Sequence, residues 1–139
     1  MSAGPRPQDN FSVFQKRYAD PHSDVALRIE QEMFGHSSGV DGFTTLEEAD
    51  VLATILDVGP ESTVLDLGAG RGWLASHIAE ASGCRMVSSD IPTEALSESQ
   101  RRFAEQALIR GGTTAAADAR ALPFHSQGID AVIHSDVFC

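Results

Sequence analysis

Three glycines at alternate positions, Gly68, Gly70 and Gly72, follow a short apolar segment that carries one carboxylate, Asp66. The stretch reads VLDLGAGRGWLA over residues 64–75, and its first half is typical of a buried strand. Glycine permits a tight turn at positive φ, lets backbone approach a ligand, and allows the next helix to pack close to the strand. The stretch therefore predicts a strand, a turn and a helix whose N-terminal amides face a ligand site.

Strand and helix patterns alternate along the rest of the chain. The pattern predicts strands over 63–67, 84–90, 113–117 and 129–135, and helices over 72–82 and 93–110. This alternation is typical of an α/β fold with a Rossmann-like parallel sheet and helices on both of its faces. The polar segment 118–128 is too short to supply a full helix between the third and fourth strands.

Two helices are predicted before the first strand. Ser23 is suited to cap a helix over residues 23–34, and Gly35 is suited to end it. Thr44 and Glu47 have the spacing of a capping box for the next helix. That helix would present four apolar side chains to a core, namely Leu46, Ala49, Ala53 and Leu56.

Composition limits the classes of partner. The 139 residues fit one domain, and their formal net charge of −10 would repel a nucleic-acid backbone or an anionic membrane surface. The N-terminal MSAGPRPQDN has no apolar stretch, so we expect a frayed tail, no secretory signal and a cytoplasmic protein. Cys84 and Cys139 are far apart without metal-ligand spacing, so we expect free thiols and no metal site.

Carboxylates end three successive predicted strands. Asp90 follows the second strand and suits the two hydroxyls of a ribose, although it also suits a helix N-terminus. Asp118 follows the third strand and suits an exocyclic amine, with the small Ala119 leaving room for a base, although a solvated turn explains it too. The third glycine arrives one residue earlier than in the dinucleotide fingerprint, and Trp73 stands at the fingerprint position. The pattern thus indicates a nucleoside ligand and disfavours a nicotinamide dinucleotide.

The stretches VLDLGAGRGWLA, SSDIP, ADARALPF and IDAVIHSDVFC together resemble the successive motifs of class I S-adenosylmethionine-dependent methyltransferases. The resemblance covers about residues 44–139, which we expect to form the cofactor-binding domain after an N-terminal tail, helix and loop over 1–43. It implies S-adenosyl-L-methionine as the cofactor. The methionine part of the cofactor would contact Asp66, Gly68, Ala69 and Gly70. The ribose would bind Asp90, and the adenine would contact Ile91, Asp118 and Ala119. The resemblance also implies that His134 and Ser135 lie near the methyl group.

The family resemblance implies methyl transfer to an O, N or C atom of a small-molecule acceptor. Such a transfer is an in-line displacement, in which positioning supplies much of the rate. His134 and Asp136 are candidates for a general base, although a histidine at a strand end more often has a structural, hydrogen-bonding role. Tyr18, Phe43 and Thr44 are candidates for a lid over the cofactor, although plain packing for the first two and a helix cap for Thr44 are the favoured interpretations. The competing functions are a non-catalytic module that binds the cofactor or a partner, and a nicotinamide-dependent enzyme.

The sequence ends shortly after the fourth predicted strand. The family implies the strand order 3-2-1-4, with the C-terminal strands of a full domain absent from this chain. The apolar fourth strand, AVIH, would then lie at an edge of the sheet. Exposed apolar edges pair readily with other chains, so the alternatives are that the chain is a fragment or that a homodimer or a partner chain covers this edge.

Overall fold

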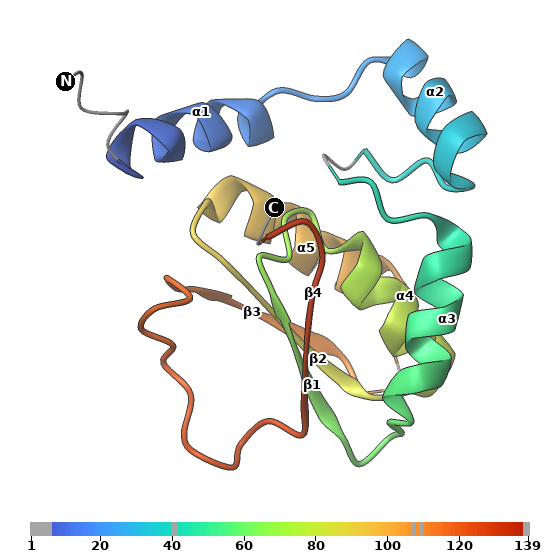
Figure 1. Cartoon of the computed structure of the whole chain (residues 1–139), viewed down its shortest axis with the longest axis vertical. Coiled ribbons are helices and arrows are strands. Elements are labelled where there is room, and N and C mark those ends of the chain that lie inside the picture. The colour runs from blue at the N-terminus through green and yellow to red at the C-terminus, as the bar shows by residue number, and fades with distance from the viewer. Residues whose placement is uncertain (1–6, 40–41, 107, 109, 138–139) are drawn as a thin grey trace, which may run out of the picture.

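The computed structural model describes residues 7–39, 42–106, 108 and 110–137. Five helices and four strands follow one another in these residues, with the three N-terminal helices preceding the first strand (Figure 1). In chain order the elements are α1 (Pro7–Ala19), α2 (Asp24–Phe34), α3 (Leu46–Leu56), β1 (Thr63–Leu67), α4 (Trp73–Ser82), β2 (Arg85–Asp90), α5 (Thr93–Glu105), β3 (Gly112–Ala116) and β4 (Ala131–His134).

The four strands form one parallel sheet in the order β3-β2-β1-β4, which confirms the predicted order. Leu67 at the end of β1 lies opposite Ser89 of β2 and His134 of β4. The carboxyl ends of these three strands therefore meet at one edge of the sheet, where ligands bind in folds of this kind. The predicted strand over 63–67 matches β1, and the other three predicted strands differ from the observed ones by one or two residues at their ends.

The crossover helices α4 and α5 both contact β2 and contact each other, so they cover the same face of the sheet. The helix α3 packs beside α4 in this layer. In the described residues no helix covers the other face, where the non-helical segment 117–130 lies. The expectation of helices on both faces is therefore met for one face only. The buried core lies between the sheet and the helices and contains Ala49, Val64, Leu74, Ala75, Ile78, Ala79, Cys84, Met86, Phe103 and Ile133.

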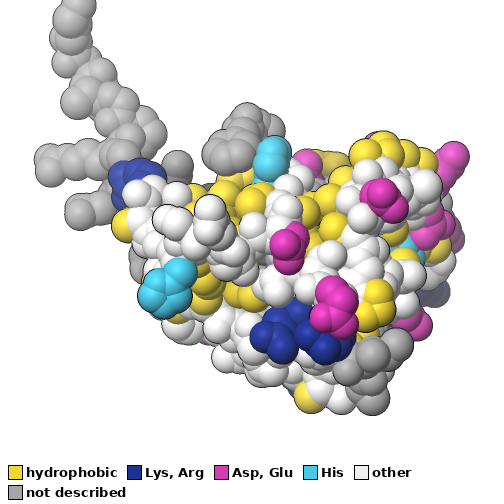
Figure 2. Space-filling view, turned by 90° about the horizontal axis from the view of Figure 1, so that it is seen from below, with side chains coloured by type: hydrophobic (Ala, Val, Ile, Leu, Met, Phe, Trp, Pro, Cys, Tyr) yellow, Lys and Arg dark blue, Asp and Glu magenta, His cyan; other side chains and the backbone are white. Residues whose placement is uncertain are grey.

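The amino ends of the strands carry a basic group of side chains. Arg85 and Arg110 line a hollow with Pro123, Phe124 and His125 beneath the sheet. Figure 2 views the molecule from below and shows a group of Lys and Arg side chains near the middle of this face, beside acidic and hydrophobic ones, with further Lys and Arg side chains at its margins. This basic group lies at the strand ends opposite to the glycine turn.

Two helix boundaries differ from the sequence-based expectation. Thr45, not Thr44, caps α3: its side chain accepts from the Glu48 amide at 3.1 Å, and Glu48 accepts from the Thr45 amide at 2.7 Å. The long helix α5 ends at Glu105, five residues before the predicted end, because Gln106 caps it.

The expectation of a frayed tail over residues 1–10 is wrong for residues 7–10, which begin α1, whereas residues 1–6 lie outside the described residues. Nη2 of Arg71, in the glycine turn, donates to the carbonyl oxygens of Tyr18 at 3.3 Å and Asp20 at 3.0 Å. These hydrogen bonds join the C-terminal end of α1 to the turn. The next helix begins after Ser23, whose side chain accepts from the Ala26 amide, as predicted.

The fourth strand lies at the edge of the described sheet, and its Val132 is 56% exposed. Pairing of this edge with another chain stays a prediction. The buried Cys84 is a free thiol, whereas Cys139 lies outside the described residues. Among the residues that the structure describes, no helix has the length and apolarity to cross a membrane.

Candidate functional site

The glycine turn joins β1 to α4 at the carboxyl edge of the sheet. Gly68, Gly70 and Gly72 have φ values of +70°, +53° and +74°, a region that side chains with a Cβ rarely adopt. The amides of Gly68 and Ala69 donate to the carbonyl oxygen of Ser89, at 2.8 and 3.1 Å. The turn is thereby attached to the end of β2.

Asp90 binds the same turn with its side chain. One carboxylate oxygen accepts from the Gly70 amide at 2.8 Å, and the other accepts from the Ile91 amide at 2.7 Å. These are charge-assisted hydrogen bonds, which are stronger than neutral ones. The structure thus brings Asp90 together with the glycines, as the sequence predicts, and leaves the Ile91 side chain 45% exposed beside them.

Asp66 lies beneath the turn and is only 2% exposed. Burial, and secondarily the negative charge of Asp90, raise the pKa of Asp66 from 3.8 to about 8. Burial disfavours the charged form of a carboxyl group, so Asp66 is mainly protonated at pH 7. An ionisable group perturbed in this way at a cleft is typical of a functional site.

A cleft of about 120 Å³ opens beside the turn. Drug-sized ligands occupy roughly 300 Å³ or more, so a nucleoside cofactor needs the wall to move. The phenol oxygen of Tyr18 lies 3.0 Å from the place of a Cβ on Gly70, so α1 forms one wall of the cleft beside the turn. The cleft is lined by Tyr18, Gly42, Asp66, Gly68, Ala69, Gly70, Arg71, Trp73, Leu74, Ser135, Asp136 and Val137.

The end of β4 forms the opposite wall. Thr44 Oγ1 and Ser135 Oγ form a hydrogen bond, and Asp136 accepts from the Phe43 amide at 2.9 Å and from Ser135 Oγ at 3.0 Å. Ser135 and Asp136 therefore lie in the cleft as predicted. His134 is exposed and lines a neighbouring hollow along α3, which shares Ser135 and Asp136 with the cleft.

Of the predicted cofactor residues, Asp90, Ile91, Asp118 and Ala119 do not line this cleft. The guanidinium of Arg120 binds the Asp118 carboxylate, with Nε–O distances of 3.0 and 3.1 Å. This hydrogen bonding lowers the pKa of Asp118 to about 2. Recognition of an adenine amine by Asp118 would therefore compete with Arg120.

Of the lid candidates from outside the sheet, Tyr18 lines the cleft and Phe43 lines the neighbouring hollow, but sequence reasoning missed other contacts from outside the sheet. Arg71 lies inside the glycine motif and binds the end of α1. Its positive charge is the one feature of the sequence that indicates a hydrogen-bonding partner near the turn. Glu30 and His36 lie in the N-terminal segment, where the His36 ring stacks on Trp73 with centroids 3.8 Å apart. No local pattern in the sequence indicates that contact.

Three comparisons relate this chain to known proteins. The family model described as "Methyltransferase domain" matches residues 64–139. Uncharacterized protein Rv1405c of Mycobacterium tuberculosis is 36% identical over 83 residues, which are 60% of this chain and 29% of that protein. The ubiquinone/menaquinone biosynthesis C-methyltransferase UbiE of Acidiphilium cryptum is 36% identical over 78 residues, which are 56% of this chain and 31% of that protein. The chain thus spans less than a third of the length of these relatives.

A solved structure supports the same fold. The geranyl diphosphate C-methyltransferase of Streptomyces coelicolor, in complex with Mg²⁺, geranyl diphosphate and S-adenosyl-L-homocysteine, superposes with a TM-score of 0.67. The identity is 16%, and the match covers 94% of this chain and 54% of that one. Together with the matched family model, this fold confirms the predicted resemblance: the chain belongs to the methyltransferase domain family, within the class I methyltransferases that use S-adenosyl-L-methionine.

Proposed function

We propose that this chain binds S-adenosyl-L-methionine at the carboxyl edge of the sheet, and that the protein transfers its methyl group to a small-molecule acceptor. One observation carries the proposal: Asp90 holds the Gly70 amide while the protonatable Asp66 lies directly beneath the same turn. Asp66 and the open backbone of the turn line the cleft, and Asp90 holds that turn from just outside the cleft lining. That combination suits a ligand with an ammonium group and a ribose.

The proposed contacts follow the strand ends. The methionine part would lie against Asp66, Gly68, Ala69 and Gly70, and the ribose would bind Asp90 beside Ile91. Ser135 and His134 would face the methyl region from the end of β4. For Asp118 and Ala119, the contact to adenine requires Arg120 to release the carboxylate, because the two side chains are now paired.

The chain's own residues would act mainly by positioning. S-adenosylmethionine supplies an activated methyl group, and the rate of its transfer depends on aligning an acceptor atom with that group. The hydrogen bonds of Thr44 to Ser135 and of Phe43 to Asp136 would hold the wall of the cleft in place. If the acceptor must lose a proton, Asp136 and His134 are the nearest candidates on this wall to accept it.

Two findings support a small-molecule acceptor. The net charge of −10 disfavours a nucleic acid. The structural neighbour from Streptomyces coelicolor is crystallised with geranyl diphosphate, a small molecule. Because the chain matches less than a third of its curated relatives, the proposal names only the class of acceptor.

We expect the Asp90→Ala variant to bind S-adenosyl-L-homocysteine about 100-fold more weakly than the wild type. The variant loses a charged acceptor for the ribose and the anchor of the Gly70 amide, and a hundredfold loss corresponds to about 2.7 kcal/mol. Isothermal titration calorimetry with the purified chain measures both dissociation constants. The Asp90→Asn variant, which retains one carbonyl acceptor, should show an intermediate affinity.

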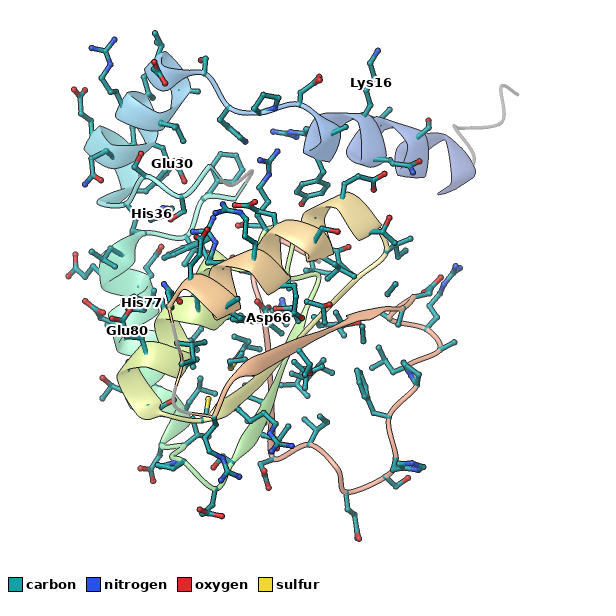
Figure 3. The ribbon with its side chains drawn as sticks, turned by 180° about the vertical axis from the view of Figure 1, so that it is seen from behind. Lys16, Glu30, His36, Asp66, His77 and Glu80 are labelled. Atoms are coloured by element: carbon teal, nitrogen blue, oxygen red, sulfur yellow. The ribbon has the colours of Figure 1, made fainter. Side chains whose placement is uncertain are left out.

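Glu80→Ala is the matched control, because it removes an exposed negative charge from α4 without touching the cleft (Figure 3). Its affinity should equal that of the wild type. A folded wild-type chain that binds no S-adenosyl-L-homocysteine, or that binds NAD in its place, would contradict the proposed function.

A further inference from the structure

The helix α1 lies beside the cleft and is attached to the glycine turn by Arg71. Figure 1 shows α1 above α5, at the end of the molecule where β1 and β4 finish. Nη2 of Arg71 donates to the carbonyl oxygens of Tyr18 and Asp20, which flank the last residue of α1. Cζ of Arg71 also lies 5.8 Å from the centroid of the Tyr18 ring. One guanidinium therefore holds both the backbone and the aromatic ring at the end of α1.

Tyr18 covers the glycine that the proposed function gives to the methionine part of the cofactor. Its phenol oxygen is 3.0 Å from the place of a Cβ on Gly70, so the backbone at Gly70 is covered from this side. The cleft that remains measures about 120 Å³, whereas drug-sized ligands occupy roughly 300 Å³ or more. A nucleoside ligand in this cleft therefore requires the end of α1 to move away, and the contacts to Arg71 are then broken.

The hydrogen-bonding capacity of Arg71 is only partly used in this arrangement. Its Nε is buried and has no hydrogen-bond partner among the described residues, and an unpaired buried donor destabilises the state that contains it. Nη2 binds neutral carbonyl oxygens, and within the described part of the chain Arg71 forms no ion pair. A guanidinium binds a carboxylate more strongly, through two parallel charge-assisted hydrogen bonds. A carboxylate would therefore compete with α1 for this side chain.

The charged groups of the cleft indicate which ligand would supply that carboxylate. Asp66 and Asp136 are the acidic side chains of the lining, and Arg71 is the one basic side chain among the described lining residues. An α-amino acid carries an ammonium group and a carboxylate on the same carbon atom. Asp66 suits the ammonium group, as proposed above, and Arg71, on the turn that follows it, suits the carboxylate.

We propose that Arg71 exchanges partners when a ligand with an amino-acid group enters the cleft. In this structure it holds the end of α1 against the glycine turn, and after the exchange it binds the carboxylate of the ligand. The helix α1 is thus an autoinhibitory segment, and the ligand displaces it by offering Arg71 a charged partner in place of two neutral ones. The identity of the ligand rests on the proposed function, whereas the attachment of α1 by Arg71 does not.

Two ligands that differ only in the carboxylate test the exchange. S-adenosyl-L-homocysteine carries this group, and its decarboxylated analogue has a hydrogen atom in its place. Both ligands must displace Tyr18, so the ratio of their dissociation constants, measured by calorimetry, reports the carboxylate alone. We expect the wild type to bind S-adenosyl-L-homocysteine about thirtyfold more tightly than the analogue, which is the effect of one charge-assisted contact.

Substitutions of Arg71 assign that ratio to its side chain. Arg71→Gln should reduce the ratio to about threefold or less, and Arg71→Lys, which keeps the charge but not the paired donors, should give an intermediate value. Lys16→Gln is the matched control, because Lys16 is exposed, points away from the fold on α1, and carries the same charge (Figure 3). Its ratio should equal that of the wild type. An unchanged ratio in Arg71→Gln overturns the carboxylate contact.

Tyr18→Ala separates the blocking of the cleft from the recognition of the ligand. This variant uncovers Gly70 and retains Arg71, so it should bind both ligands about tenfold more tightly while keeping the wild-type ratio. Affinities equal to those of the wild type overturn the autoinhibitory role. Binding of S-adenosyl-L-homocysteine without any preference for the carboxylate contradicts the exchange alone. If neither protein binds either ligand, the proposed function is contradicted, and the exchange with it.

Trypsin tests the attachment of α1 without any ligand. Lys16 and Arg17 lie in the last turn of α1, so the rate of cleavage there reports how often this end opens. Arg71→Gln should be cleaved about fivefold faster than the wild type at these residues, and equally fast at Arg101 on α5. Equal rates at the end of α1 overturn the attachment. Saturating S-adenosyl-L-homocysteine should accelerate this cleavage in the wild type, and slower cleavage would show that α1 closes over the ligand, which overturns the exchange.

Discussion

The Asp66→Asn variant is expected to be more stable than the wild type at pH 7 and to bind the proposed cofactor more weakly. Asp66 is buried, and its pKa of about 8 lies far above the value of 3.8 that it has when exposed. Between these two values the folded chain binds one more proton than the unfolded chain. The contribution of Asp66 to stability is therefore greatest below about pH 4 and falls as pH rises toward about 8.

The size of this effect follows from the pH interval. Each pH unit in the window costs about 1.4 kcal/mol, so the native state loses about 4 kcal/mol by pH 7. Asparagine avoids this loss because it takes up no proton, but its buried amide needs partners and offsets about 2 kcal/mol of the gain. We expect a net gain of about 2 kcal/mol at pH 7, or roughly 5 °C in melting temperature.

Thermal unfolding of both proteins between pH 5 and pH 8.5 measures this difference. The advantage of Asp66→Asn should grow with pH and level off above about 8, where wild-type Asp66 is ionised in both states. A difference that is constant across this range would show that Asp66 does not titrate in the way its burial requires. Asp57→Asn, at the exposed end of α3, is a control for which no such trend is expected.

Cofactor binding should show the opposite effect of the same substitution. The ammonium group of S-adenosyl-L-homocysteine favours the ionised carboxyl group, so binding at pH 7 should release close to one proton from wild-type Asp66. Calorimetry in two buffers of different ionisation enthalpy measures that proton. Asp66→Asn should release none from this site and bind about tenfold more weakly. Equal proton release by both proteins would contradict this role of Asp66.

The sequence predicted the part of the site that lies within one strand–turn–helix unit. Glycine spacing and a carboxylate in an apolar strand are local features, and the structure keeps Asp66, Gly68 and Gly70 together as expected. The position of Asp90 beside the glycine turn is also predictable, because the carboxyl ends of parallel strands meet at one edge of the sheet. Whether these residues bind the cofactor stays a prediction.

The features that sequence reasoning missed depend on contacts between distant segments. Thr44 and Thr45 both have a glutamate three residues later, so either fits a capping box. Thr45 is the cap in the structure because the Thr44 side chain binds Ser135 and its carbonyl binds His36. Similarly, α1 has little apolar periodicity, and its end is joined to the rest by Arg71.

Asp118 illustrates a different limit. Its place after the third strand was read correctly, but Arg120, two residues later, binds its carboxylate. The arginine was visible in the sequence, and a pair at this spacing in a loop forms without any help from the fold. Position at a strand end therefore does not by itself leave a side chain available to a ligand.

Gly72→Ala is expected to cause the largest loss of stability, at about 3 to 4 kcal/mol. Gly72 precedes α4 at a φ of +74°, and a Cβ there would lie 2.1 Å from Ser99 Oγ and 3.1 Å from the Ser99 Cα on α5. Ser99 is fully buried and donates to Ser88 Oγ at 3.0 Å, so its side chain has little room to move. The strained φ costs about 1 to 2 kcal/mol, and overpacking adds about 1 to 3 kcal/mol.

Gly111→Ala separates the two contributions. Gly111 has a similar φ of +68°, but a Cβ there would meet nothing within 4 Å. This variant should lose only the backbone part, about 1 kcal/mol. Urea unfolding of the three proteins gives both differences, and equal losses at the two glycines would show that close packing of α4 against α5 does not depend on Gly72. A larger loss of stability at Gly72 would instead show that the absence of a side chain there allows α4 and α5 to pack closely.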